Sequence, residues 1–442
     1  MKVTAIIAEF NPFHNGHAWL INHAKSSRGA DYVIILMSGN FVQRGEPAIF
    51  DKFTRAHMAL LCGADLVLEL PTAFATASAR EFARAAAALA DKTGLVNELL
   101  FGAEAPSQPD LQAEVLLSLL QETAEKLFTE ETAFQEELRK HIKAGASYPR
   151  ARAAAFSRTL GNHSSSKAEA ISELLSAPNS ILALEYLQAL KLRGSSIRPA
   201  LALRQGDAYH EALPSGSPFA SATALRRMLF SGKSVSAYVP DCLLPFYGMS
   251  GCETMNPSSF RTTLSTTAPP CIGPEALSLP LQHRLLSLLR GGTDFECFAD
   301  VSSEIAGCLR RSAHRLCSYS SHVEELWTKQ YTRSRISRAL LHVLLGITKE
   351  QTEQMKQQDY IPFLRVLGFS NAAKAELLPT LKRCAKVPVV TKAAAAKELL
   401  ADEIYYSDFY YALQMNKGFT AGDALEDVPM IKNELQRQIV IV

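Results

Sequence analysis

The sequence has few of the patterns that mark a zinc-binding, secreted or membrane protein. Its eight cysteines form no Cys-x-x-Cys pair, which argues against a zinc knuckle and a disulfide framework, so reduced, buried thiols are expected. No run of about 18 uninterrupted apolar residues occurs, so no membrane span is predicted. The first residues, MKVTAIIAEFNPF, lack the long apolar region and cleavage site of a secretory signal. A cytoplasmic protein is therefore expected.

Two common nucleotide-binding patterns are also absent. Gly232-Lys233-Ser234 resembles the end of a P-loop, but Arg227 stands where that motif needs its first glycine. No Gly-x-Gly-x-x-Gly is present, so a dinucleotide site lacks its fingerprint. The formal net charge is only +2, which excludes a basic field over the whole molecule. Any nucleic-acid site must then be a local patch.

Short apolar runs alternate with helical patterns in the first 100 residues. The strands are predicted over 3–8, 32–37, 65–70 and 95–101, and the helices over 16–29, 51–63 and 74–91. Continuous apolar runs are typical of strands that are buried on both faces. The alternation with short connections predicts an α/β fold, in which helices cover both faces of a parallel sheet.

The rest of the chain divides by composition. The segment 109–192 is mostly helical in pattern, and a strand over 197–203 and a helix over 221–232 follow. The stretch 236–280 is rich in Pro, Ser and Thr and predicts an irregular connection. The segment 281–384 is strongly helical in pattern, and 439–442 is a short apolar run that fits a strand. We therefore predict one domain over 1–235 and a mainly α-helical domain over 281–442.

The segment Glu9-Phe-Asn-Pro-Phe-His-Asn-Gly-His17 follows the first predicted strand. His14 and His17 are three residues apart and share one face at the start of a helix. The N-terminus of a helix binds anions, and two imidazoles there can donate hydrogen bonds to a phosphate. Charge that develops on an α-phosphate under attack is what such donors stabilise. Taken alone, the pair fits a metal site or a core pair equally well.

This segment resembles the His-x-Gly-His signature of the nucleotidyltransferase superfamily. Longer matches make the chain similar to the bacterial tRNA(Met) cytidine acetate ligase family. They lie in 37–48, 51–56, 63–71, 101–104, 147–149 and 178–187, and at Arg204 before a Gly and a Tyr-His pair. They cover most of 1–230, whereas the C-terminal half matches mainly over 331–346. The segment around Glu304 and Gly307 departs from the order of the family's motif.

The resemblance implies a Rossmann-like nucleotidyltransferase domain over 1–235 that binds ATP, with the helical domain 281–442 as the candidate tRNA-binding part. It implies activation of acetate by ATP to acetyl-adenylate and transfer of the acetyl group to N4 of the wobble cytidine of elongator tRNA(Met). Mg²⁺ is expected to be bound mainly through the phosphates, with no dedicated metal site. The implied catalytic residues are His14 and His17. The implied ATP contacts are Ile7, Ala8, Glu9, Phe10, Asn11, Pro12, Phe13, His14, Asn15, Gly16, His17, Ala18, Trp19, Leu20, Gly102, Asn179 and Arg204.

Further phosphate contacts are suggested by hydroxyl and basic side chains near helix starts. Ser221 and Thr223, with Arg226 one turn later, resemble the superfamily's Ser-x-Thr-x-x-Arg motif, and a plain helix cap is the alternative. Lys52 lies at a predicted helix start after the loop 40–46, which fits a lid or a solvated loop. An N-cap is the alternative role for Asn179.

Basic side chains gather in two places that could contact RNA. Around residue 330 they are spaced for one or two faces of a helix, with Tyr331 among them. An RNA contact and a solvated helix face fit this spacing equally well. The residues predicted to contact tRNA are Lys329, Arg333, Arg335 and Arg338, and also Arg150 and Arg152.

Two other functions stay open on sequence grounds. The protein could be a small-molecule adenylyl- or cytidylyltransferase, although such enzymes usually lack a helical second domain. It could also be a non-catalytic RNA-binding protein with a vestigial nucleotide site, although the complete first motif argues against that. The sequence leaves the oligomeric state and the acyl specificity open.

Overall fold

The computed structural model describes residues 1–104, 112–129, 131–146, 151, 154–156, 158, 177–203, 217–249, 270–328, 330–415 and 432–442. Within these ranges an eight-stranded sheet forms the centre of the molecule, with the strand order β10-β8-β5-β2-β1-β6-β7 and β9 paired to β8. Its strands are β1 (Val3–Ala8), β2 (Tyr32–Ser38), β5 (Leu66–Leu70), β6 (Glu98–Ala103), β7 (Arg198–Leu203), β8 (Leu364–Phe369), β9 (Val389–Val390) and β10 (Val440–Ile441). A small hairpin consists of β3 (Phe41–Val42) and β4 (Glu46–Pro47).

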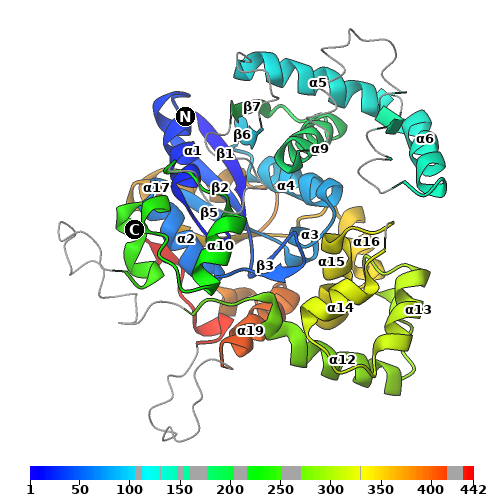
Figure 1. The fold of residues 1–442 in the computed structure, drawn as a ribbon. Helices are drawn as coiled ribbons and strands as arrows, with labels where there is room; N and C mark the ends of the chain where they lie inside the picture. Colours follow the sequence, from blue (N-terminus) through cyan, green and yellow to red (C-terminus); the bar gives the residue numbers. More distant parts are fainter. Residues whose placement is uncertain are drawn as a thin grey trace, which may run out of the picture.

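The helices alternate with the strands in the first part of the chain and dominate the later part. They are α1 (Asn15–Ser26), α2 (Lys52–Leu61), α3 (Thr72–Ala75), α4 (Ala79–Thr93), α5 (Ala113–Thr129), α6 (Glu131–Lys143), α9 (Pro178–Leu192), α10 (Ala222–Phe230), α12 (Ser278–Arg290), α13 (Ser303–Ser312), α14 (Tyr319–Leu326), α15 (Arg333–Leu345), α16 (Lys349–Gln357), α17 (Asn371–Ala375), α18 (Leu377–Cys384) and α19 (Ala401–Met415). Figure 1 shows α12–α16 gathered beside the sheet, near β3 and α3.

The five strands β5-β2-β1-β6-β7 are parallel and have the order of a Rossmann fold. The order in which strands are added to the sheet reverses after β2, since β2 lies on one side of β1 and the next parallel strands, β6 and β7, lie on the other. In such sheets, ligands bind outside the carboxyl ends of the strands at this switch point. The loop after β1 and the end of β6 are therefore expected to meet at a binding site.

Alternating side chains of the strands enter two separate cores. Val3 and Ala5 of β1 face a core built with α4, α5 and α9. Ile6 faces the core on the other side, with α1, α2 and α10. This alternation follows from the two-residue period of a strand, and it confirms the predicted α/β fold with both faces of the sheet covered.

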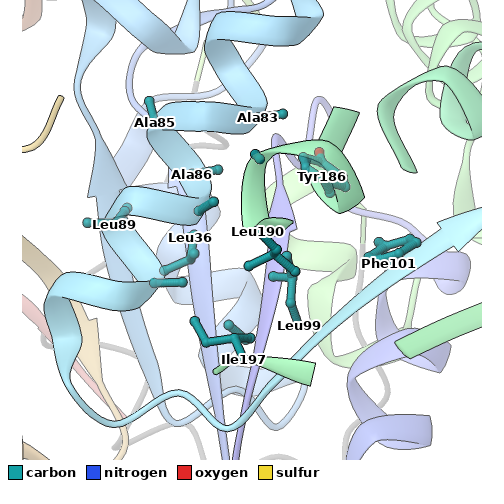
Figure 2. Packing of buried hydrophobic residues seen from close by; sticks show 14 of the residues in the cluster. Leu36, Ala83, Ala85, Ala86, Leu89, Leu99, Phe101, Tyr186, Leu190 and Ile197 are labelled. Carbon is teal, nitrogen blue, oxygen red and sulfur yellow. The ribbon is translucent and has the colours of Figure 1, made fainter. Parts of the chain in front are cut away.

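The core under α4 and α9 depends on small side chains. Figure 2 shows Ala83 and Ala86 of α4 close to Leu190 of α9, with Leu99 of β6 beneath them. Alanines let the two helices approach one another and the sheet closely, while the leucines fill the remaining volume. The close packing fixes the position of α9, whose first turn reaches the switch point.

One strand lies where the sequence predicts helix. Leu364–Phe369 is fully buried as β8 and runs antiparallel to β5. The strand interrupts the helical pattern predicted over 281–384, because a short, mostly apolar run between helices fits a strand as well as a helix. The strand predicted at 439–442 is confirmed as β10, which pairs with β8.

The later helices have their own core, which is joined to the sheet domain. Leucines of α12 and α15 pack with Tyr410 of α19, and Phe41 of β3 and Ala73 of α3 enter the same cluster. In the described part of 236–280 the chain forms 3-10 turns at Ser236–Tyr238, Asp241–Tyr247 and Pro274–Leu277, and α12 begins at Ser278. The division at 235 and 281 stays a prediction, because β8–β10 return to the first sheet.

The described residues contain neither a disulfide bond nor a helix that could span a membrane. Their seven cysteines form no disulfide, but they are half-buried or, at Cys297, exposed, so the expectation of buried thiols is wrong. No helix among them combines the length and apolar composition needed to cross a bilayer.

Candidate active site

The loop after β1 is held in place by hydrogen bonds to its backbone. Arg55 donates to the carbonyls of Glu9 and Ser38 at 2.7 and 3.0 Å, and Tyr247 donates to the carbonyl of Phe13 at 2.5 Å. The Asn11 side chain accepts from the backbone of the loop before α2, at Ile49 N. Because these partners come from separate elements, the turn before α1 is fixed from several sides.

The two histidines form a stacked pair at the start of α1. His14 is the N-cap residue, and its Nδ1 accepts from Gly16 N at 3.1 Å. His17 Nδ1 accepts from His14 N at 3.2 Å, and the ring centroids are 3.8 Å apart. A neutral imidazole that accepts at Nδ1 carries its proton on Nε2. The caps therefore set one tautomer in both rings, each with an N–H donor at Nε2.

Gly16 makes room for this pair. A Cβ at position 16 would lie 2.9 Å from Cε1 of His14, closer than carbon atoms pack. The sequence predicts that Gly16 allows the backbone to approach a ligand. The structure adds a second reason, since a larger residue would displace the ring of His14.

A cleft of about 1050 Å³ lies over the switch point. Among the residues predicted to contact ATP, it is lined by Ile7, Ala8, Glu9, Phe10, Asn11, His14, Gly16, His17, Trp19, Leu20, Gly102 and Asn179. Pro12, Phe13, Asn15 and Ala18 do not line it, since Pro12 and Phe13 are buried and Asn15 donates to Pro218 O. Arg204 lies outside the described residues. The cleft brings together residues from Ile6 to Arg338, which are far apart along the chain.

Glu9 stands at the carboxyl end of β1 and lines this cleft. Its Oε1 accepts from Gln43 N at 2.7 Å. Burial raises the pKa of the Glu9 carboxyl above its usual value, while the hydrogen bond from Gln43 and the charges of Arg44 and Arg226 act in the opposite direction. Arginine charge thus surrounds the inner end of the cleft, where an anionic ligand would gain most.

Asn179 is held by a carboxylate that the sequence did not single out for a role. Its Nδ2 and backbone N–H donate to Glu104 Oε1 at 2.6 and 3.4 Å. Ser180 donates to Glu104 Oε2 through its N–H and its hydroxyl. Asn179 lies in the first turn of α9 after Pro178, so the alternative of an N-cap is wrong. Glu104 instead accepts the hydrogen bonds of the first turn of α9, and Asn179 lines the cleft.

Replacing Asn179 with Ala is expected to raise KM for ATP by about tenfold with little change in kcat, because a hydrogen bond made equally in the ground and transition states is lost. Steady-state kinetics with varied ATP measure this. Ser180→Ala is the matched control, since Ser180 also binds Glu104 but does not line the cleft. Equal KM values for the two variants would contradict a role for Asn179 in binding.

The second phosphate motif lies beside the first. Arg226 donates to Asn11 O at 2.7 Å and to Thr223 Oγ1 at 3.4 Å. Ser221 caps α10 by accepting from Ala224 N, so the capping alternative is correct for this residue. All three side chains nevertheless line the cleft, which brings the motifs after β1 and before α10 together.

Lys52 does not reach the cleft. Its side chain is fully buried, and Nζ binds Glu69 at 2.8 Å and Glu434 at 3.2 Å. The prediction of a phosphate contact for Lys52 is wrong, because two carboxylates already surround its charge. The loop 40–46 is also anchored: Asn40 is buried, and Gly45 O accepts from Tyr319 and Ser337. In this structure the loop is neither a solvated segment nor an open lid.

The basic residues near 330 differ in their exposure and in the cleft that they line. Arg333 is exposed, lines the cleft, binds Glu324 at 2.6 Å and lies 4.3 Å over the Trp327 ring. Arg338 is buried and bound to Asp300 at 2.9 Å, so it does not belong to an exposed basic face of the helix. Arg335 faces a second cleft described below. Lys329, Arg150 and Arg152 lie outside the described residues.

Within the described part of the chain, one group of three potential metal ligands lies together, Cys317, His322 and Glu325. It belongs to the region of α14 and does not line the main cleft. The cleft's own carboxylates, Glu9, Glu46 and Glu324, belong to no such group among the described residues.

The comparisons with known proteins decide the family. Residues 1–423 match the family model described as HIGH Nucleotidyl Transferase. The tRNA(Met) cytidine acetate ligase of Thermoanaerobacter sp. strain X514 is 33% identical over 98% of this chain and 100% of its own length. The chain belongs to this ligase family. Another member, from Lysinibacillus sphaericus strain C3-41, is 32% identical over 98% of the chain and 100% of its own length.

Solved structures of the family agree with the fold. Thermotoga maritima TmcAL bound with alpha-thio ATP superposes with a TM-score of 0.79 at 27% identity, with 100% of both chains covered. The apo form of the same protein gives 0.77 at 29% identity over 93% of this chain and 95% of that chain. The predicted nucleotidyltransferase fold is therefore confirmed.

Proposed function

We propose that this ligase family member activates acetate with ATP and transfers the acetyl group to N4 of the wobble cytidine of elongator tRNA(Met). The observation that carries the proposal is the stacked pair of His14 and His17, which both line a cleft at the sheet's switch point. The name shared by the relatives supports the substrate.

The proposed reaction has two balanced steps. A carboxylate oxygen of acetate attacks the α-phosphorus of ATP, and the bond to the bridging oxygen breaks to release pyrophosphate. The cytidine N4 then attacks the acetyl carbonyl, AMP leaves, and N4 loses one proton. In the first step negative charge grows on the α-phosphoryl oxygens and on the leaving pyrophosphate. The imidazole N–H groups would stabilise the charge on the α-phosphoryl oxygens, and Arg226 would stabilise the charge on the leaving pyrophosphate.

Mg²⁺ is proposed to arrive with the triphosphate. Glu9, Glu46 and Glu324 line the cleft but stand on three separate elements. One or two of these carboxylates suit an ion that keeps phosphate oxygens and waters as its other ligands. Bound in this way, the ion would neutralise part of the triphosphate charge.

Acetate-dependent exchange of pyrophosphate into ATP tests the first step. The purified protein is expected to exchange labelled pyrophosphate into ATP only when acetate is present, without any tRNA. Exchange with a nicotinamide or pantetheine precursor in place of acetate would instead identify a small-molecule nucleotidyltransferase. Absence of exchange with every acid tried, together with RNA binding, would favour the non-catalytic alternative.

Replacing Arg226 with Ala is expected to lower kcat/KM for ATP in the exchange by about 10²-fold, because a charge-assisted contact to phosphate is lost. Arg226→Lys is expected to restore only part of the activity, since an ammonium cannot bind Asn11 O and a phosphate in the same fork geometry. The exchange rate at varied ATP measures both. Full activity of the Ala variant would exclude Arg226 from the site.

Transfer to RNA is tested separately. An in vitro transcript of elongator tRNA(Met) is expected to gain one acetyl group, from labelled acetate, only in the presence of ATP. Labelled acetyl-CoA supplied without ATP is expected to give no product. Acetylation from acetyl-CoA alone would contradict the proposed chemistry.

A further inference from the structure

A second cleft of about 760 Å³ adjoins the first. The two share Ala79, Ile181, Thr332, Ser334 and Arg338 in their linings. The walls of the second cleft come from α4, α5, α6, α9 and α15. It is therefore a continuation of the ATP cleft that runs between the sheet domain and the later helices.

Arginine dominates the charge of this second cleft. Arg80 and Arg84 come from α4, Arg139 from α6, and Arg335 and Arg338 from α15. The carboxylates in the lining are Glu185 and Asp300. Five cations against two anions make a basic groove in a protein whose formal net charge is only +2.

Part of this charge is not neutralised within the protein. Asp300 forms an ion pair with Arg338 at 2.9 Å, Glu185 lies 4.0 Å from Arg80, and Glu81 lies 3.5 Å from Arg84. Among the described residues, no carboxylate lies within ion-pair distance of Arg139 or Arg335, although the charge of Arg335 acts on Asp300, and Arg335 Nε is buried without a hydrogen-bond partner. A buried donor without a partner is costly unless a ligand satisfies it. Anionic ligands are thus favoured in this groove.

The groove also contains an exposed aromatic ring. Phe128 lines it and is 39% exposed, with Lys191 Nζ 5.6 Å from the ring centroid. Exposed rings among cations are the combination that binds RNA, since bases stack on the ring while arginines contact the phosphates. A small anion would bind the arginines but would not contact the ring. The combination of arginines with an exposed aromatic ring therefore favours a nucleic acid.

We propose that this groove, lined by Arg80, Arg84, Arg139 and Arg335, binds the phosphate backbone of the RNA whose cytidine enters the adjoining cleft. The inference rests on the proposed function for the identity of the RNA. Because the groove opens into the ATP cleft at Thr332 and Ser334, a strand held in it can place one extruded base beside the adenylate.

Charge reversal on two separate helices tests the groove. Arg139→Glu and Arg84→Glu are each expected to weaken binding of an elongator tRNA(Met) transcript roughly tenfold or more. Each is also expected to lower the slope of log affinity against log salt concentration by about one. Filter binding at several salt concentrations measures both quantities. Arg290→Glu, an exposed arginine near the end of α12 outside both clefts, is expected to bind like the unmodified protein.

The outcomes separate the two proposals. Unchanged tRNA affinity in both groove variants, or an equal loss in Arg290→Glu, would overturn the groove. Thermal melting shows whether each variant is folded. If either Arg139→Glu or Arg84→Glu fails to fold, the other variant still tests the groove, because the two residues lie on different helices. The proposed function fails separately if the unmodified protein shows no acetate-dependent pyrophosphate exchange in the absence of RNA.

Discussion

Replacing His17 with Ala is expected to lower the rate of acetate-dependent ATP–pyrophosphate exchange by about 10²- to 10³-fold, the usual cost of removing one donor to a developing charge. The variant also loses the acceptor for His14 N, so the capping pair at the start of α1 is broken. Both effects act on the same turn. Pre-steady-state measurement of adenylate formation, with ATP saturating, isolates the loss in the chemical step.

His283→Ala is the control for this experiment. His283 lies on α12, is exposed and lines neither cleft, so exchange is expected at the unmodified rate. His17→Asn adds a second comparison, because an amide can accept from His14 N without supplying an imidazole. Recovery of the fold but not of the rate in His17→Asn would assign the loss to chemistry. A fully active His17→Ala protein would exclude the histidine pair from catalysis.

Lys52→Met is expected to destabilise the protein by roughly 3–5 kcal/mol, the cost of removing one partner from a buried ion pair. Glu69 of β5 and Glu434 near the C-terminus would both remain buried, with only Arg365 nearby. Burial alone would lower the pKa of Lys52, but the charges of Glu434 and Glu69 raise it, so the ammonium stays charged in the fold. Chemical denaturation gives the free energy of unfolding.

The exposed residue Lys349 provides the matched control. Lys349→Met removes the same charge from the start of α16, and its effect is expected to stay within about 0.5 kcal/mol. Adding Glu69→Leu to Lys52→Met is expected to recover part of the lost stability, because an uncompensated carboxylate is removed. A Lys52→Met protein as stable as Lys349→Met would show that the buried charges do not interact as the distances indicate.

The parts predicted best from the sequence are those defined by local pattern. The strand over 3–8, the turn, Gly16 and the two histidines are consecutive, so their geometry follows from short-range rules. The parallel sheet with both faces covered also followed, because strand and helix alternate with short connections, whereas the Rossmann-like domain was implied by the family resemblance. These elements place the turn before α1, the candidate phosphate site, without any knowledge of the distant contacts.

The misassigned residues all depend on partners far along the chain. Lys52 resembled a phosphate ligand because it begins a helix beside a polar loop, whereas its carboxylates lie 17 and 382 residues away. One signal was available: Glu69 stands in the apolar run DLVLEL, and a buried glutamate needs a cationic partner. Arg338 gave no such signal, because Asp300 lies in a segment without a clear pattern. Glu104 was visible in its motif, but only the fold shows that it holds Asn179.

The position of β8 has a consequence for how the chain matures. β5 is made early, yet its second neighbour in the sheet comes from Leu364–Phe369, which is synthesised much later. Until that segment leaves the ribosome, β5 presents an open row of backbone donors and acceptors, which other chains can pair with. Pairings between such distant segments form slowly. The nascent protein therefore passes through a long aggregation-prone stage, in which shielding by chaperones should raise the yield of folded enzyme.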